Sequence, residues 1–313
     1  MSVVVQFFPA PFQELLKSRK ITDIMVTNSG DVFVDQDGAL AQSDFHLDAQ
    51  QLRIAVQAVA RSAGKDIDES RPILDVRLPD GSRVAALAHP ASLGGWSLTI
   101  RRFNRWFSLE ELIDAGTVSA PHADALLAAL EAHRNILVAG GTSAGKSTLI
   151  NALIGKIPLG ERLILIEKPA ELSVQHANVL RWEATDGTEN TPAITVGDLV
   201  SHAMRHRPDR IIVGEVKDAS AFFLLQALNS GHSGSLSTIH ADSASLALDR
   251  LSGLAIGAYP NLHHAFVRQE TANAIHLVAH MARKNRRRYL QSLLAVDGYD
   301  PSTNRFVTKS IEA

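Results

Sequence analysis

Residues 136–150, ILVAGGTSAGKSTLI, constrain the fold of this chain more than any other stretch. They join an apolar run, a glycine-rich turn and an amphipathic segment, and they match the pattern G-x-x-x-x-G-K-[ST] from Gly140 to Ser147. Glycines let the backbone turn with its N–H groups pointing at phosphate oxygens, and a following helix adds its positive N-terminal end. The stretch therefore predicts a strand, a phosphate-binding loop (P-loop) and a helix.

The loop and the turn after it carry the predicted contacts to a nucleoside triphosphate and Mg²⁺. Lys146 is expected to reach the β- and γ-phosphates, and the hydroxyl of Ser147 to hold Mg²⁺. The predicted nucleotide-binding residues are Gly141, Thr142, Ser143, Ala144, Gly145, Lys146, Ser147 and Thr148. A chance glycine-rich turn is the alternative, but the strand-like and helix-like flanks favour the phosphate loop.

The composition is that of a soluble globular protein, with 45% hydrophobic and 20% charged residues. Its 313 residues are enough for about two domains. The 31 basic and 33 acidic side chains give a formal charge of -2, which excludes a global attraction to nucleic acid or anionic lipid. Because there is no cysteine, disulfides, cysteine zinc sites and thiol nucleophiles are excluded as well.

The location of the protein is predicted from its apolar segments. No apolar run approaches the roughly 18 residues that span a bilayer, and the N-terminus lacks the layout of a signal peptide. We therefore expect a cytoplasmic protein whose membrane contact, if any, is peripheral.

Two domains are predicted from the order of strand and helix patterns. Residues 1–103 contain grouped strand patterns and one helical pattern at 48–63, which indicates a small α+β domain. Residues 104–118 have mixed composition and are interpreted as a linker. In residues 119–313 strands alternate with helices, which predicts a parallel sheet covered on both faces. The predicted strands are 136–139, 162–167, 179–182 and 210–214, and the helices 147–154, 197–206 and 218–229.

Three later segments place reactive side chains after predicted strands. Glu167 ends the apolar run 162–167, where a carboxylate can orient or deprotonate an attacking water. Glu215 follows the apolar RIIVG in the layout of a Walker B element and is expected to reach Mg²⁺ through a water. His232 and His240 lie in GHSGSLSTIHA, and a histidine can hydrogen-bond the γ-phosphate and report its loss. Glu171 is a weaker second candidate for the base.

The segments GGTSAGKST, LILIEKPAEL, RPDRIIVGE and GHSGSLSTIHA resemble the Walker A, Asp box, Walker B and His box of the secretion traffic ATPases. The chain is most similar to the branch that serves type IV secretion and conjugative transfer. The resemblance covers roughly residues 119–252 and implies a RecA-like C-terminal domain that hydrolyses ATP with Mg²⁺. It implies catalytic roles for Lys146, Glu167, Glu215 and His240, and nucleotide binding by His232.

The resemblance also implies a homo-hexameric ring beneath an inner-membrane secretion or conjugation apparatus, with each nucleotide between the two domains. Arg101 and Arg102 match by position the arginines that reach the phosphates. Because neighbouring strand residues face opposite sides, we expect one of them to contact nucleotide and the other to form a salt bridge. Lys168 and Lys217 depart from the family pattern, where an acidic residue and an arginine are usual, and they bear on the hydrolysis rate.

Several alternatives stay open at the level of sequence. A pilus retraction or assembly motor of the same superfamily has similar motifs, whereas a type II motor generally carries a tetracysteine element that this chain lacks. A P-loop kinase or switch is a second class, although no N-K-x-D guanine motif is present. The basic run from Arg283 to Arg288 joins two predicted strands and could contact nucleic acid or lipid head groups, but such a run is usually a solvated turn.

Overall fold

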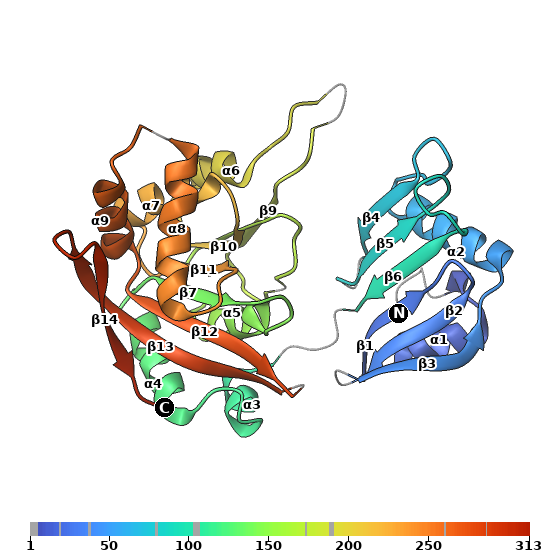
Figure 1. Cartoon of the computed structure of the whole chain (residues 1–313), viewed down its shortest axis with the longest axis horizontal. Helices are drawn as coiled ribbons and strands as arrows, with labels where there is room; N and C mark the ends of the chain where they lie inside the picture. The colour runs from blue at the N-terminus through green and yellow to red at the C-terminus, as the bar shows by residue number, and fades with distance from the viewer. Residues whose placement is uncertain are drawn as a thin grey trace. The chain divides into compact units, whose positions relative to one another are not determined.

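Two β-sheets organise the chain in the computed structural model, one in each of two structural units (Figure 1). The units are Met1–Arg105 and Trp106–Ala313. The predicted end of the first domain at residue 103 lies outside the described residues, and the predicted domain limits stay predictions. The structure describes residues 6–18, 20–36, 39–78, 81–102, 107–172, 174–187, 191–259, 261–285 and 287–313.

The first unit is an antiparallel sheet of six strands with the order β3-β2-β1-β6-β5-β4. Its strands are β1 (Ile21–Val26), β2 (Asp31–Gln36), β3 (Ala39–His46), β4 (Ile73–Arg77), β5 (Arg83–Leu87) and β6 (Ser97–Arg101). Alternate apolar residues of these strands, such as Ile24 and Ile100, are buried with α1 (Ala10–Lys17) and α2 (Ala49–Ser62). Asp48 caps α2 in a capping box with Gln51. The predicted α+β character and the predicted helix are confirmed.

The second unit contains an eight-stranded sheet with the order β14-β13-β12-β7-β11-β10-β8-β9. Its strands are β7 (Ile136–Gly140), β8 (Leu163–Glu167), β9 (Val179–Glu183), β10 (Arg210–Val216), β11 (Leu236–Ile239), β12 (Leu277–Lys284), β13 (Arg287–Asp300) and β14 (Arg305–Ile311). The six strands from β12 to β9 are parallel, whereas β13 and β14 extend the sheet in antiparallel pairs. The predicted parallel sheet is therefore confirmed, and β14 is an addition that the sequence analysis missed.

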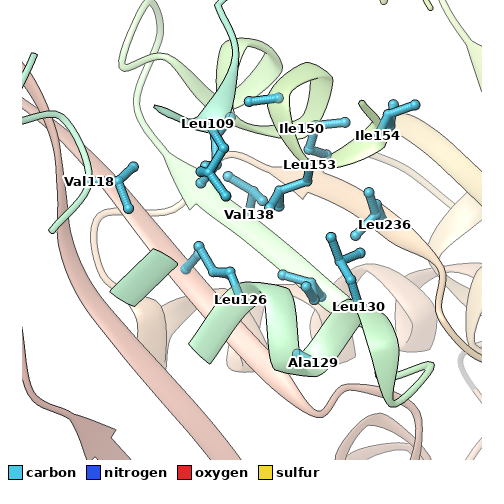
Figure 2. Packing of buried hydrophobic residues seen from close by; sticks show 14 of the residues in the cluster. Leu109, Val118, Leu126, Ala129, Leu130, Val138, Ile150, Leu153, Ile154 and Leu236 are labelled. Atoms are coloured by element: carbon cyan, nitrogen blue, oxygen red, sulfur yellow. The ribbon is translucent and has the colours of Figure 1, made fainter. Parts of the chain in front are cut away.

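Helices cover both faces of this second sheet, and adjacent residues of one strand supply the two cores. Val138 of β7 packs in one core, where Figure 2 shows it near Leu126 of α4 and Leu153 of α5. Leu137 packs in the opposite core with α6 to α9. This alternation explains why the strand is apolar at every position. The helices are α3 (Leu109–Asp114), α4 (Ala120–Glu131), α5 (Lys146–Ile154), α6 (Val196–Ala203), the 3-10 helix η2 (Met204–His206), α7 (Ser220–Asn229), α8 (Ala244–Ala258) and α9 (His264–Ala274).

Part of the segment predicted as a linker packs within the second unit. α3 lies in this segment, and its Leu109 and Leu112 are buried in the same core as Val138. Ser108 caps the helix in a capping box with Glu111. The segment therefore contains a short amphipathic helix whose apolar side is small: Leu109 and Leu112 are buried, and Ile113 is partly buried against the same core.

A buried arginine holds the amino end of the second sheet. Arg210, the first residue of β10, is 1% exposed. Its Nε and Nη2 donate to the two carboxylate oxygens of Glu161 at 2.5 and 3.1 Å. Nη1 donates to the carbonyl oxygen of Gly234 and Nη2 to that of Leu130, both at 3.0 Å. One side chain thus joins the end of α4 to the loops before β8 and β11.

Among the described residues, no helix combines the length and the apolar character that crossing a membrane requires.

Candidate nucleotide site

The phosphate loop connects the carboxyl end of β7 to α5, and its backbone adopts conformations that favour glycine. Gly140 has φ 150°, and a Cβ there would lie 2.4 Å from the carbonyl oxygen of Met281 on β12. Gly145 has φ 100° and directly precedes α5. Ser143 also lies in the left-handed region, with φ 58°. The two pattern glycines are therefore required by backbone geometry and, at Gly140, by the close approach of β12.

Lys146 lies inside this loop. Its side chain is buried, and its Nζ donates to the carbonyl oxygens of Gly140 and Gly141, both at 2.9 Å. Burial lowers the pKa of the ammonium, whereas the negative charges of Glu215 and Glu171 oppose this shift. The desolvated cation is thus held where an anion entering the loop can pair with it.

The start of α5 also fits a phosphate ligand. No side chain caps the first turn of α5, which contains no acidic residue. A helix start of this kind offers backbone N–H groups and a positive dipole end to an anion. Ser147 and Thr148 are half-buried in this turn, whereas Gly141, Thr142 and Ser143 are exposed. The residues present therefore fit the phosphates of a nucleotide, with the Ser147 hydroxyl next to them.

Glu167 ends β8, and its carboxylate is fixed by the backbone that follows. The side chain is 2% exposed, and its Oε1 accepts hydrogen bonds from the N–H groups of Glu171 and Leu172, both at 2.7 Å. Lys168, the neighbouring departure from the family pattern, forms an ion pair with Asp186. The positive charge of Lys168 is therefore paired with the exposed carboxylate of Asp186.

Glu215 lies in β10 at an irregularity in the strand. Val213 pairs with Ser237 and Val216 with Ile239, so two residues of β10 oppose the single Thr238 of β11. Thr238 Oγ1 donates to the carbonyl oxygen of Gly214 at 2.5 Å. Such bulges redirect side chains and are common beside active sites.

His240 directly follows β11, and its Nε2 lies 3.1 Å from Oε1 of Glu215. Burial lowers the pKa of the imidazole, with a further contribution from the positive charge of Lys146, while Glu215 opposes the shift. At neutral pH the contact therefore joins a carboxylate to a neutral ring. A neutral ring has one N–H donor and one acceptor, so the Nε2–H of His240 donates to Glu215 and Nδ1 is left as an acceptor.

The structure places one predicted site residue, His232, away from the phosphate loop. His232 precedes β11, at the amino edge of the sheet, and its Nδ1 lies 3.2 Å from the carbonyl oxygen of Ala227. This histidine is therefore not brought to the phosphate loop of its own chain, because the loop lies at the carboxyl edge. The sequence pattern placed both histidines in one segment, but the intervening strand separates them.

The two arginines of the first unit have different contacts. Arg101 Nε lies 2.8 Å from Oδ1 of Asp23, its cross-strand neighbour on β1. Arg102 Nη1 donates to the backbone carbonyl oxygens of Ser18 and Ile21. Their contact with nucleotide stays a prediction.

One residue at the loop was not predicted as part of the site. Arg288 of β13 donates from Nε to the carbonyl oxygen of Ser143 at 2.9 Å. It belongs to the basic run that the sequence analysis interpreted as a solvated turn, and Arg283, Lys284 and Arg287 of that run are exposed. The charge of the run was a signal, but the local pattern contains nothing that selects Arg288.

The family model for the type II/IV secretion system protein matches residues 9–306 of this chain. The chain belongs to this family. It is 30% identical over 288 residues to the conjugal transfer protein TrbB of Rhizobium radiobacter, covering 91% of this chain and 86% of TrbB. It is 36% identical over 275 residues to the type IV secretion system protein PtlH of Bordetella pertussis, covering 79% of this chain and 80% of PtlH. These relatives confirm the predicted type IV secretion and conjugation branch of the secretion traffic ATPases.

Two similar solved structures confirm the α/β, two-domain fold. The VirB11 ATPase of the Brucella suis type IV secretion system, solved with sulphate, is 27% identical with a TM-score of 0.50, covering 97% of this chain and 99% of VirB11. The pilus retraction motor PilT, solved with ADP, is 22% identical with a TM-score of 0.65, covering 90% of this chain and 78% of PilT. The similarity to PilT supports the fold alone.

Proposed function

We propose that the chain is an ATP-hydrolysing motor subunit that energises type IV secretion or conjugative DNA transfer. One observation carries the proposal: the phosphate loop, Glu167, Glu215 and His240 lie at the carboxyl edge of four neighbouring parallel strands, β7, β11, β10 and β8. Ligands of open α/β sheets collect at this edge. TrbB is named a conjugal transfer protein and PtlH a type IV secretion system protein, and these names support transfer or secretion as the process that ATP hydrolysis energises.

Each residue of the site has a role in the proposed hydrolysis. Lys146 and the N–H groups of its loop bind the phosphates, and Ser147 and Glu215 are the residues that would hold Mg²⁺. When bound, Mg²⁺ neutralises charge that develops on the phosphate oxygens. Glu167 orients the attacking water and accepts its proton, for which its fixed carboxylate is suited. The Nε2–H of His240 donates to Glu215 in the structure, and once Glu215 turns to Mg²⁺ it would donate to the γ-phosphate instead and so distinguish ATP from ADP.

The proposal includes a homo-hexameric ring at the cytoplasmic side of an inner-membrane apparatus. Each subunit would bind one ATP at its phosphate loop, and Arg101 or Arg102 is proposed as a further contact to the phosphates. ATP binding and product release would change the conformation of the subunit, which is a common way to convert nucleotide state into motion.

Phosphate release by the purified protein tests the catalytic assignments. We expect Lys146→Ala to lose nucleotide binding and hydrolysis together, because the loop loses its cation. We expect Glu167→Gln to bind ATP normally and to hydrolyse it roughly a hundredfold more slowly, the effect of removing a general base. If the glutamine variant is as fast as the parent, the assignment of the base is wrong.

Glu171→Gln is the matched control for the base. Glu171 is exposed, and the contact that ties it to Glu167 is made by its backbone N–H. The charge of Glu171 acts on Lys146, so the substitution removes a charge near the site without removing the proposed base, and hydrolysis should fall far less than in Glu167→Gln. A large loss in this variant, with Glu167→Gln unaffected, would instead identify Glu171 as the base.

A further inference from the structure

Arg288 lies against the phosphate loop although it belongs to the basic run between β12 and β13. Its Nε donates to the carbonyl oxygen of Ser143 at 2.9 Å. A Cβ placed on Gly145 would lie 3.4 Å from the Cδ of Arg288 and 3.8 Å from its Cβ. The aliphatic stem of the arginine therefore packs along the end of the loop while its guanidinium bonds the middle of it.

This hydrogen bond fixes the orientation of one peptide group in the loop. A trans peptide is planar, so the carbonyl oxygen of Ser143 and the N–H of Ala144 point in opposite directions. A donor that holds the carbonyl on the outside holds the N–H toward the inside. The Ala144 N–H indeed points at the carbonyl oxygen of Gly141 across the loop, at a long 3.4 Å. An anion in the loop offers this N–H a stronger acceptor than that carbonyl.

The peptide needs such support because Ser143 has φ 58°. The left-handed conformation is unfavourable for a residue with a side chain. Without an external contact the segment around Ser143 has other conformations available, in which the N–H of Ala144 no longer points inward. The hydrogen bond from Arg288 of β13 selects the conformation in which this N–H points inward, before a ligand binds.

The charge of Arg288 adds to this effect. Within the described part of the chain, no carboxylate lies within ion-pair distance of Arg288, so the guanidinium acts on the loop without a neutralising partner there. Arg283, its cross-strand neighbour on β12, is exposed and carries the same sign. The loop therefore lies beside unneutralised positive charge, which favours an anionic ligand.

We propose that Arg288 is a positioning residue for the phosphate loop, which holds the Ser143–Ala144 peptide in the anion-binding orientation and thereby sets the affinity for the phosphates of a nucleotide. The inference rests on the nucleotide site of the proposed function, but it does not depend on hydrolysis. Arg288 acts on binding, so its removal should raise KM and leave kcat nearly unchanged, the pattern of a lost ground-state contribution.

Equilibrium binding of Mg-ADP to the parent and to Arg288→Gln tests the inference. We expect Arg288→Gln to weaken ADP binding about tenfold, which corresponds to the loss of one charge-assisted hydrogen bond. Arg288→Lys retains the charge and a donor on a stem of similar length, so it should recover most of the affinity. The kcat at saturating ATP should differ from that of the parent by less than about twofold.

Arg287→Gln is the matched control, because it removes the same charge from the adjacent exposed residue. Neighbouring strand residues face opposite sides of the sheet, so this variant should bind ADP like the parent. Equal weakening in both glutamine variants would overturn the inference, since only net charge would then matter. Unchanged binding in Arg288→Gln would also overturn it. A parent that binds no ADP would overturn the proposed function and this inference together.

Discussion

Gly214 determines where the Glu167 carboxylate can lie. A Cβ at Gly214 would be 2.8 Å from the Cγ of Glu167 and 3.1 Å from its Oε1. The backbone of Gly214 is outside the left-handed region, so an alanine there would not be strained by its own conformation. The consequence of a side chain at this position is therefore steric, and it is transmitted to the residue proposed as the base.

We expect Gly214→Ala to displace the Glu167 carboxylate and to lower kcat about a hundredfold, the effect of misplacing a catalytic group by about 1 Å. ADP affinity should be unchanged, because Gly214 makes no part of the phosphate loop. Gly253→Ala in α8 is the matched control, since a Cβ there meets no atom within 4 Å. Steady-state hydrolysis and ADP binding measure both effects, and a Gly214→Ala variant with parental kcat would contradict the prediction.

The sequence predicted those site residues whose role depends on local pattern. Lys146 follows from the loop motif, and Glu167 and Glu215 follow from apolar runs that end in a carboxylate. The contact between Arg288 and Ser143 joins residues 145 positions apart, and neither residue type nor spacing indicates it. The steric role of Gly214 likewise depends on a tertiary contact, because the pairing of β10 with β8 brings Gly214 next to Glu167.

At the scale of elements, Arg210 connects three segments that the sheet itself does not join. We expect Arg210→Met to reduce the free energy of unfolding of the second unit by about 3 to 5 kcal/mol, because Glu161 would lose its buried partner. Two backbone carbonyl oxygens, those of Gly234 and Leu130, would lose their donors as well. Urea denaturation measures the loss.

Arg207→Gln provides the comparison, because Arg207 is 86% exposed and lies 3.9 Å from Asp209. An exposed pair of this kind contributes little, so the change should stay below about 0.5 kcal/mol. Adding Glu161→Gln to Arg210→Met should recover part of the loss, since the unpaired charge is removed. Equal unfolding midpoints for Arg210→Met and the parent would contradict the proposed role of the buried pair.

Elements with local start signals were predictable, and elements defined by tertiary pairing were not. Asp48 caps α2, which begins within the helical pattern predicted at residues 48–63, and the cap of α4, Ser119, is a start signal of the same kind. β14 is mostly exposed and is defined by its pairing with β13. α3 was missed because its two buried leucines lie in a short polar segment.

At the scale of the whole molecule, the proposed ring is the feature that a single chain cannot display. We expect the purified protein with Mg-ATP to have the mass of six copies of the 33.8 kDa chain. Size-exclusion chromatography with light scattering measures this mass. Lys146→Ala separates two cases, because a ring that requires bound nucleotide should be lost in this variant even when ATP is present. A monomer in the parent with and without ATP would contradict the hexamer and the motor built from it.

The pairing of β7 has a consequence for the order in which the molecule is completed. Ile136 of β7 pairs with Leu236 of β11 on one side and with Leu277 of β12 on the other. Both partners leave the ribosome long after the phosphate loop itself, and the Met281 carbonyl that packs on Gly140 follows later still. Strand pairings between distant residues form only after the intervening chain has been synthesised. A nascent chain that already contains the phosphate loop therefore still lacks the β11 and β12 partners of β7. The proposed nucleotide site can therefore take its finished form only after the chain has been synthesised as far as Met281.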